Sequence, residues 1–186
     1  MNPSYRPLAL IQGTTVPAMD EVGRRFEAQD YVVPELLLSA RAMNGSLDLL
    51  RPLLEGRDAA FAGRVAIGMV QGDLHDIGKN LVASMLEGGG FEMIDLGTDV
   101  PPQAFVDAIR QQGVQIVALS ALITVTMASM RKTIEALTAA GVRDRVKVMV
   151  GGAPVTQQYA DQIGADGYSE NASAAVALAR RLCGGA

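Results

Sequence analysis

The sole histidine of the chain lies in segment 72–80, which reads GDLHDIGKN and crowds polar groups together. A single histidine such as His75 is by itself often structural, but Asp73 stands just before it in this segment. That carboxylate can hold one imidazole nitrogen and leave the other free for a metal, as the carboxylate partners of metal-bound histidines commonly do. Gly78 allows a close backbone approach. The segment therefore predicts a metal or cofactor site around His75.

The composition limits which metal His75 could hold. Zinc bound by protein ligands alone takes three or four His, Cys or carboxylate groups, and the chain has no second histidine. Its one cysteine, Cys183, stands near the carboxyl terminus, so neither a disulfide framework nor a thiolate metal site can form within the chain. The metal must then bring its other ligands. A macrocycle supplies four equatorial donors and leaves the protein an axial position, as in haem or corrinoid binding.

Short apolar runs and helix-length amphipathic stretches alternate along most of the chain. We expect strands at 65–70, 92–96, 116–119, 146–150 and 167–169. We expect helices at 78–87, 102–112, 126–140, 156–163 and 172–182. This alternation predicts an α/β fold, with a flavodoxin-like (Rossmann-like) five-stranded parallel sheet covered on both faces. Ligands of such sheets gather at the carboxyl ends of the strands, where His75 falls.

The amino-terminal part has helical periodicity. Met19, Val22 and Phe26 recur at three and four residues, and a second apolar series follows Pro34, which suits the first turn of a helix. We therefore expect two helices there.

Gly, Asp and Arg interrupt the apolar pattern at 55–63, which suggests a short, mobile linker. We expect a helical unit over 1–56 and the sheet domain over 63–186.

Composition excludes several classes of function. The 186 residues carry a formal net charge of −4 with no Lys/Arg-rich run, so a nucleic-acid or anionic-membrane partner is not expected. The apolar stretches are too short to span a membrane, and no signal peptide precedes them. We expect a cytoplasmic protein.

Three elements together resemble the cobalamin-binding signature: Asp73-x-His75-x-x-Gly78, then Ser120-Ala121-Leu122 after the third strand, then Gly151-Gly152 after the fourth. The resemblance implies that the corrinoid's dimethylbenzimidazole base leaves cobalt and that His75 replaces it. The displaced base and its nucleotide tail would then enter a slot between sheet and helices. Gly151 and Gly152 would leave room for that tail, although a simple turn is the alternative.

The resemblance also implies a set of corrinoid contacts. They are Asp73, Leu74, Asp76, Ile77, Gly78, Ser120, Leu122, Thr124, Ala153 and Tyr168, with Tyr168 closing the far side of the tail pocket. Related methyltransferase modules place a hydroxyl on the motif aspartate at the position of Thr126, which implies a His75-Asp73-Thr126 relay for a proton. The alternative is that Thr126 only caps the following helix.

The amino-terminal unit resembles the small helical cap that methyltransferases place over the upper face of the corrinoid. Phe26 and Val33 match positions whose side chains shield the methyl-cobalt bond, although ordinary helix packing would also explain them. The cap usually has four helices, and the segment before Met19 is too short for the first two. We therefore expect a truncated cap.

The whole pattern is similar to the corrinoid proteins of methylamine, methanol and aromatic O-demethylation systems, and more distantly to the cobalamin module of methionine synthase. This implies a non-catalytic carrier of cobalamin or a related corrinoid, loaded as methylcobalamin. Its implied partners are a substrate-specific corrinoid methyltransferase, a second methyltransferase acting on tetrahydrofolate or a thiol, and a reductive activator.

Other classes fit the sequence less well. A cobalamin-dependent sensor or regulatory module would need a DNA-binding unit and a basic surface. A phospho-receiver domain needs an aspartate at the end of the third strand, where Ser120 stands. A hydrolase using Ser120, His75 and Asp73 would be supported by a Gly-x-Ser-x-Gly elbow, which the chain lacks.

Overall fold

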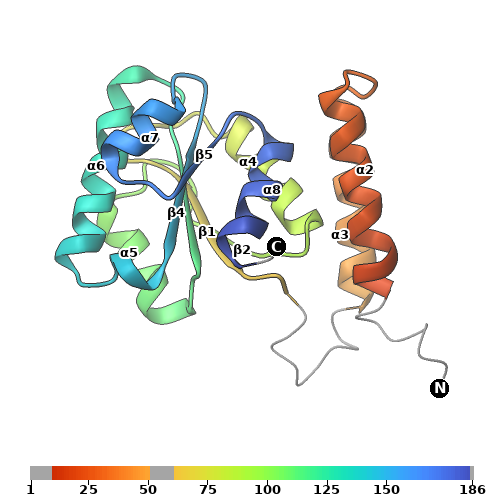
Figure 1. The fold of residues 1–186 in the computed structure, drawn as a ribbon, viewed down its shortest axis with the longest axis horizontal. Helices are drawn as coiled ribbons and strands as arrows, with labels where there is room; N and C mark the ends of the chain where they lie inside the picture. The colour runs from red at the N-terminus through yellow and green to blue at the C-terminus, as the bar shows by residue number, and fades with distance from the viewer. Residues whose placement is uncertain (1–9, 51–60, 185–186) are drawn as a thin grey trace.

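A five-stranded parallel sheet in the order β2-β1-β3-β4-β5 forms the centre of the computed structural model, which describes residues 10–50 and 61–184 (Figure 1). The strands are β1 Arg64–Met69, β2 Glu92–Asp95, β3 Ile116–Ser120, β4 Lys147–Gly151 and β5 Gly167–Ser169. The parallel pairing confirms the predicted flavodoxin-like fold.

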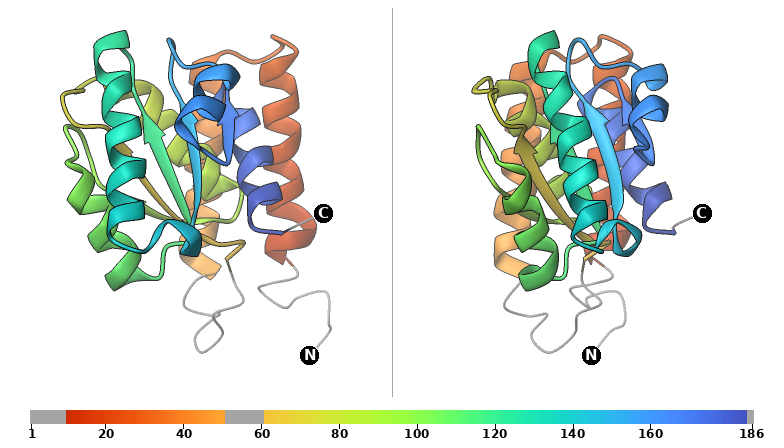
Figure 2. Two further views of the ribbon diagram at one scale, coloured as in Figure 1. Left: turned by 60° about the vertical axis from the view of Figure 1, so that its left-hand side comes forward. Right: turned by 90° about the vertical axis from the view of Figure 1, so that its left-hand side faces the viewer.

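Helices cover the sheet on both faces (Figures 1 and 2). They are α4 Ile77–Gly88, α5 Pro102–Gln112, α6 Thr124–Ala139, α7 Gln157–Ile163 and α8 Ala172–Leu182. The core between α4, α8 and the sheet includes Ile67, Ala118 and Met149, and the core on the side of α5, α6 and α7 includes Val117 and Val150. The central strands are therefore apolar on both faces, which is why they read as continuous runs in the sequence.

The amino-terminal residues form a short π-helical segment, Ile11–Thr15, followed by α2 Val16–Glu27 and α3 Val33–Leu50. The two helices lie beside α4 and α8 (Figure 1). Met19 and Leu36 are buried in the same core as Met85 of α4, so the α2–α3 hairpin and the sheet domain share apolar packing.

The predicted linker at 55–63 lies mostly outside the described residues, as do residues 1–9 and 51–56 of the expected helical unit. The division into 1–56 and 63–186 stays a prediction. No helix in the described ranges is long and apolar enough to cross a membrane.

Candidate functional site

A cavity of about 740 Å³ opens at the carboxyl ends of the strands. Ile67, Ala118 and Met149 line it from the sheet face that α4 and α8 cover. Val82 of α4 and Ala172 of α8 line the opposite wall. The cavity is therefore a slot between sheet and helices that continues upward to the loops after the strands.

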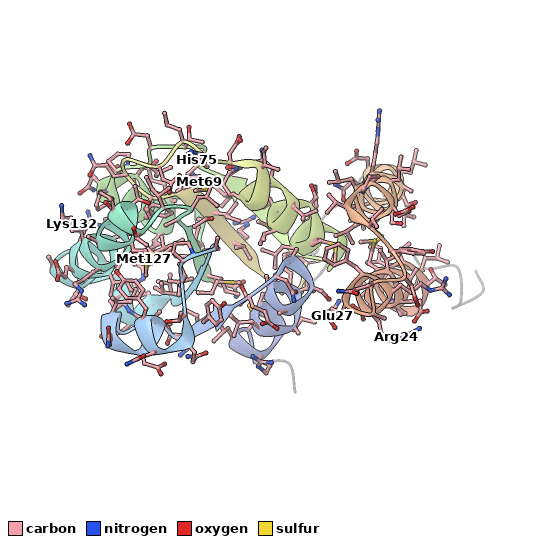
Figure 3. The ribbon with its side chains drawn as sticks, turned by 90° about the horizontal axis from the view of Figure 1, so that it is seen from above. Arg24, Glu27, Met69, His75, Met127 and Lys132 are labelled. Carbon is pink, nitrogen blue, oxygen red and sulfur yellow. The ribbon has the colours of Figure 1, made fainter. Side chains whose placement is uncertain are left out.

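His75 lines this slot from the loop that follows β1; Figure 3 labels it together with Met69, the last residue of that strand. Its side chain is 54 % exposed, whereas that of Asp73 is fully buried. The ring Nδ1 is 2.9 Å from Asp73 Oδ1, and the His75 backbone N–H donates to the same oxygen at 3.1 Å. Because ionised Asp73 can only accept, it selects the tautomer with the proton on Nδ1 and leaves a lone pair on Nε2.

The second oxygen of Asp73 is held from another part of the chain. Asp73 Oδ2 accepts from the Leu122 backbone N–H at 2.7 Å and from the Thr126 hydroxyl at 2.6 Å. Burial alone would raise the pKa of Asp73, but the hydrogen bonds from Thr126, Leu122 and His75 outweigh it and hold that pKa below its ordinary range. The carboxylate therefore stays ionised in a site that water does not reach.

Thr126 does not cap α6. The helix begins at Thr124, and the capping position belongs to Ile123, whose extended backbone precedes it. Thr126 lies within the first turn, with its hydroxyl 2.6 Å from Asp73 Oδ2 and 2.8 Å from the Ile123 carbonyl oxygen. The contact that a relay requires is present, while its role in proton transfer stays a prediction.

The residues around His75 fit a metal macrocycle. His75 Nε2 has no hydrogen-bond partner within the described part of the chain. Gly78 lines the cavity, and a Cβ built there would meet no protein atom within 4 Å. No group of three or more His, Cys, Asp or Glu side chains that could hold a bare metal ion exists in residues 10–50 and 61–184. One axial nitrogen beside a deep slot suits a corrinoid.

The two glycines at the end of β4, Gly151 and Gly152, also meet neighbouring backbone. Gly152 has a φ of +125°, and a Cβ there would collide with the carbonyl oxygen of Ala121. A Cβ at Gly151 would lie 3.1 Å from the Ser169 carbonyl oxygen. Both glycines line the cavity. The Ala121 carbonyl requires glycine at position 152, whereas the Ser169 carbonyl only makes position 151 tight.

Most of the predicted contact residues line the cavity. They are Phe26, Leu74, His75, Asp76, Ile77, Gly78, Ser120, Leu122, Gly151, Gly152 and Ala153. Asp73 lies buried beneath it, exposed Thr124 begins α6 outside it, and Val33 is 43 % exposed on the hairpin.

Tyr168 is placed differently from the prediction. Its side chain packs against the core on the α5, α6 and α7 side of the sheet. Because successive side chains of a strand point to opposite faces, its neighbour Ser169 lines the cavity instead.

Sequence reasoning missed the loop from β5 to α8. Ser169, Glu170 and Asn171 line the cavity there, and Asn171 also caps α8 by accepting from the Ala174 N–H at 2.7 Å. The carboxyl-end rule could have identified this loop, since it follows a predicted strand. Buried Lys79 also lines the cavity, with its ammonium group on Asp95.

Comparison with known proteins shows the family. Models described as the B12 binding domain match residues 63–177 and residues 2–51. The chain is 47 % identical over 173 residues to the trimethylamine corrinoid protein of Methanosarcina barkeri, covering 92 % of this chain and 80 % of that protein. It is 46 % identical over 165 residues to dimethylamine corrinoid protein 3 of Methanosarcina mazei, covering 88 % of this chain and 99 % of that protein.

Solved structures agree with these relatives. A novel cobalamin-binding protein from Desulfitobacterium hafniense DCB-2 matches with a TM-score of 0.81 and 36 % identity, over 95 % of this chain and 82 % of that one. The methanol:cobalamin methyltransferase complex MtaBC from Methanosarcina barkeri matches with a TM-score of 0.83 and 28 % identity. The match covers 97 % of this chain and 69 % of that one. The chain therefore belongs to the B12-binding domain family, and its cofactor is a cobalamin-type corrinoid.

Proposed function

We propose that this chain carries a corrinoid through axial ligation by His75 and works as the methyl-carrying component of a multi-component methyltransferase system. The observation that carries the proposal is the His75 ring, fixed by Asp73 at Nδ1 and unpartnered at Nε2 within the described residues, at the mouth of a deep slot. Relatives named trimethylamine and dimethylamine corrinoid proteins, and the methanol:cobalamin methyltransferase complex, support the role of a corrinoid carrier.

When bound, the corrinoid supplies a cobalt centre that accepts and gives up a methyl group. His75 Nε2 would hold the corrinoid through its metal, and Asp73 would keep the proton on Nδ1. The Thr126–Asp73 pair would help to accommodate a proton on the ring. The chain would therefore adjust ligation rather than perform the chemistry.

The partners follow from this carrier role. A substrate-specific methyltransferase would load the corrinoid, and a second one would move the methyl group to an acceptor such as tetrahydrofolate or a thiol. A reductive activator would restore the cofactor after oxidation. The helical unit expected over residues 1–56 would cover the corrinoid on the domain expected over 63–186, and it would have to move aside for each partner.

Isotope labelling tests the ligation directly. Protein labelled with ¹⁵N in histidine is loaded with cobalamin and reduced to the Co(II) state for electron paramagnetic resonance. The nitrogen hyperfine pattern should change on labelling, because His75 is the sole histidine.

The His75→Ala variant is the matched control, and its pattern should not respond to labelling. A wild-type pattern that ignores the label would show that benzimidazole remains on cobalt, and the proposal would be rejected.

A further inference from the structure

The loop that carries Asp73 and His75 is held by hydrogen bonds from a segment that does not line the cavity. This segment is the connection from β2 to α5, residues 96–101. Within it, the carboxylate of Asp99 accepts from the Gly72 backbone N–H at 2.7 Å through Oδ1. The Asp99 backbone N–H donates to the Asp73 carbonyl oxygen at 2.9 Å. One residue thus holds the peptide groups on both sides of the Gly72–Asp73 junction.

The backbone of Asp99 is set for this contact. Its φ is +53°, in the left-handed region that aspartate adopts more readily than most non-glycine residues. The next residue, Val100, pairs with Val70 in a parallel bridge, and its N–H donates to the Met69 carbonyl oxygen at 3.0 Å. The backbone of Asp99 is therefore held next to the end of β1, within reach of Gly72.

Gly72 has a φ of +90° and lies in the loop after β1, where the hydrogen bonds of the sheet no longer hold the backbone. The Gly72–Asp73 junction therefore needs such a contact. The position of Asp73 decides where the imidazole of His75 points, since Asp73 Oδ1 holds both the ring and the backbone N–H of His75. A displacement of the backbone at Gly72 would therefore move Asp73 and change the direction in which His75 Nε2 points.

A second bond from the same part of the chain supports the far side of the loop. Lys79 in the first turns of α4 is buried, with its Nζ 2.5 Å from Asp95 Oδ2 at the end of β2. The other oxygen of Asp95 accepts from the Gly97 N–H at 2.8 Å. The segment that holds Gly72 through Asp99 is thus also tied to the helix that follows His75.

We propose that Asp99 is a positioning residue for the axial histidine: by holding the Gly72–Asp73 junction, it aligns Asp73 and hence His75 Nε2 toward cobalt. This rests on the ligand role proposed for His75. Asp99 touches neither the cavity nor His75, so it acts only through the loop.

Three substitutions in the full chain separate the hydrogen bond from the backbone. Asp99→Ala removes the acceptor and leaves a residue that disfavours positive φ. Asp99→Gly removes the acceptor but accepts this φ freely, and Asp99→Asn keeps both an Oδ1 acceptor and tolerance of the conformation.

The first readout is the fraction of bound Co(II) cobalamin with histidine on cobalt, measured by electron paramagnetic resonance. Partners of metal-bound histidines contribute about tenfold to a hundredfold. Asp99 acts one contact further away, so we expect the histidine-on equilibrium constant to fall about tenfold in Asp99→Ala and Asp99→Gly, the lower end of that range. Asp99→Asn should remain close to wild type.

The second readout uses the protein without corrinoid. The Gly72 amide proton, hydrogen-bonded to a carboxylate, should shift and exchange faster in the Ala and Gly variants and little in the Asn variant. Failure of the His75 proposal would show as a missing histidine signal in the wild type, while the Gly72 amide would still report on the Asp99 contact.

Several results would overturn the positioning role. They are a wild-type histidine-on fraction in Asp99→Ala or Asp99→Gly, an Asn variant as impaired as the Ala variant, and a Gly72 amide that does not respond to any substitution. Circular dichroism confirms folding, and Asp99→Gly, which removes the acceptor but accepts the positive φ, keeps the test valid if the Ala variant does not fold.

Discussion

Each carboxylate oxygen of Asp73 faces a different part of the molecule. Oδ1 holds the ring and backbone of His75, and Oδ2 holds the Leu122 backbone and the Thr126 hydroxyl. The side chain therefore joins the loop after β1 to the loop after β3, the two loops on which the sequence motifs lie. A buried carboxylate with these donors is stabilised in its ionised form, which explains how it can remain charged without water.

Thr126→Val tests this at the residue scale. Loss of one hydrogen bond to a charged group should lower the free energy of unfolding by about 1.5–3 kcal/mol at neutral pH. Because the pKa of folded Asp73 is lowered, its contribution is fully present above the unfolded value near pH 3.9 and is lost as pH falls through the lowered pKa. The gap between wild type and variant should therefore shrink in acid.

Urea unfolding of the corrinoid-free protein at pH 7 and pH 2 measures that gap, because the contribution is lost only well below the ordinary carboxylate range. Thr126→Ser keeps the hydroxyl and should stay near wild type. Bound corrinoid should be retained in all three proteins, with weaker histidine ligation in the Val variant. An equal gap at both pH values would show that Thr126 contributes packing and not a hydrogen bond to the Asp73 carboxylate.

At the scale of elements, the strands and helices follow from periodicity, but the face that a side chain takes on a short strand does not. The prediction identified 167–169 as a strand, and Tyr168 was expected in the cavity. In β5 it faces the opposite core, because Gly167 must lie against Leu178 of α8, where a Cβ would come within 2.6 Å of a methyl group. The packing of α8, which the local sequence does not reveal, decides the face.

Gly152 illustrates the same limit. Its sequence position predicts a need for glycine, but the reason depends on the distant carbonyl group of Ala121. A bulky residue at Gly152 would disturb the backbone, so it cannot probe a nucleotide tail cleanly. Ala118 of β3 is the better probe of the space for the tail, since it is buried and lines the slot.

Ala118→Leu should therefore separate the slot from the axial ligand. Overpacking of a tight site costs about 1–3 kcal/mol, and 1.4 kcal/mol is about tenfold in affinity, so cobalamin should bind roughly one to two orders of magnitude more weakly. Cobinamide lacks the nucleotide tail and should be nearly unaffected. His75→Ala should weaken both, because both lose the axial nitrogen.

Titration of both corrinoids by absorption spectroscopy gives the two affinities. Val117→Ile is the matched control. Val117 immediately precedes Ala118 in β3 and is buried, but it faces the core on the α5, α6 and α7 side of the sheet. Equal losses of cobalamin and cobinamide in Ala118→Leu, with the fold intact, would mean that the slot does not hold the tail.

At the scale of the whole molecule, the α2–α3 hairpin packs against the sheet domain through apolar and polar contacts. Asp20 pairs with Arg180 of α8 at 2.8 Å, and Asn44 donates to Glu87 of α4 at 2.7 Å. Gly23 permits the close approach of α2 to Ser173, since a Cβ there would lie 2.7 Å from the serine hydroxyl. The apolar spacing of three and four residues predicts the two helices, whereas their contacts with α4 and α8 could not be predicted from it.

Of the two residues expected to shield the methyl-cobalt bond, the α2–α3 hairpin places only one beside the cavity. Phe26 lines the cavity, whereas Val33 stands 43 % exposed at the start of α3 and does not line it. The two positions therefore form a matched pair, one aimed at the site and one on the same hairpin outside it.

Phe26→Ala should expose the upper face of a bound corrinoid without changing its histidine ligation. With protein loaded with hydroxocobalamin, the rate at which cyanide replaces the upper ligand should rise about tenfold if the ring contributes about 1.4 kcal/mol to the barrier. Val33→Ala should react at the wild-type rate. Stopped-flow absorption measures the exchange, and electron paramagnetic resonance of the reduced proteins checks that histidine stays on cobalt. Unchanged exchange in Phe26→Ala would show that the hairpin does not cover the reactive face, whereas acceleration by Val33→Ala alone would assign the covering role to the other end of the turn between α2 and α3.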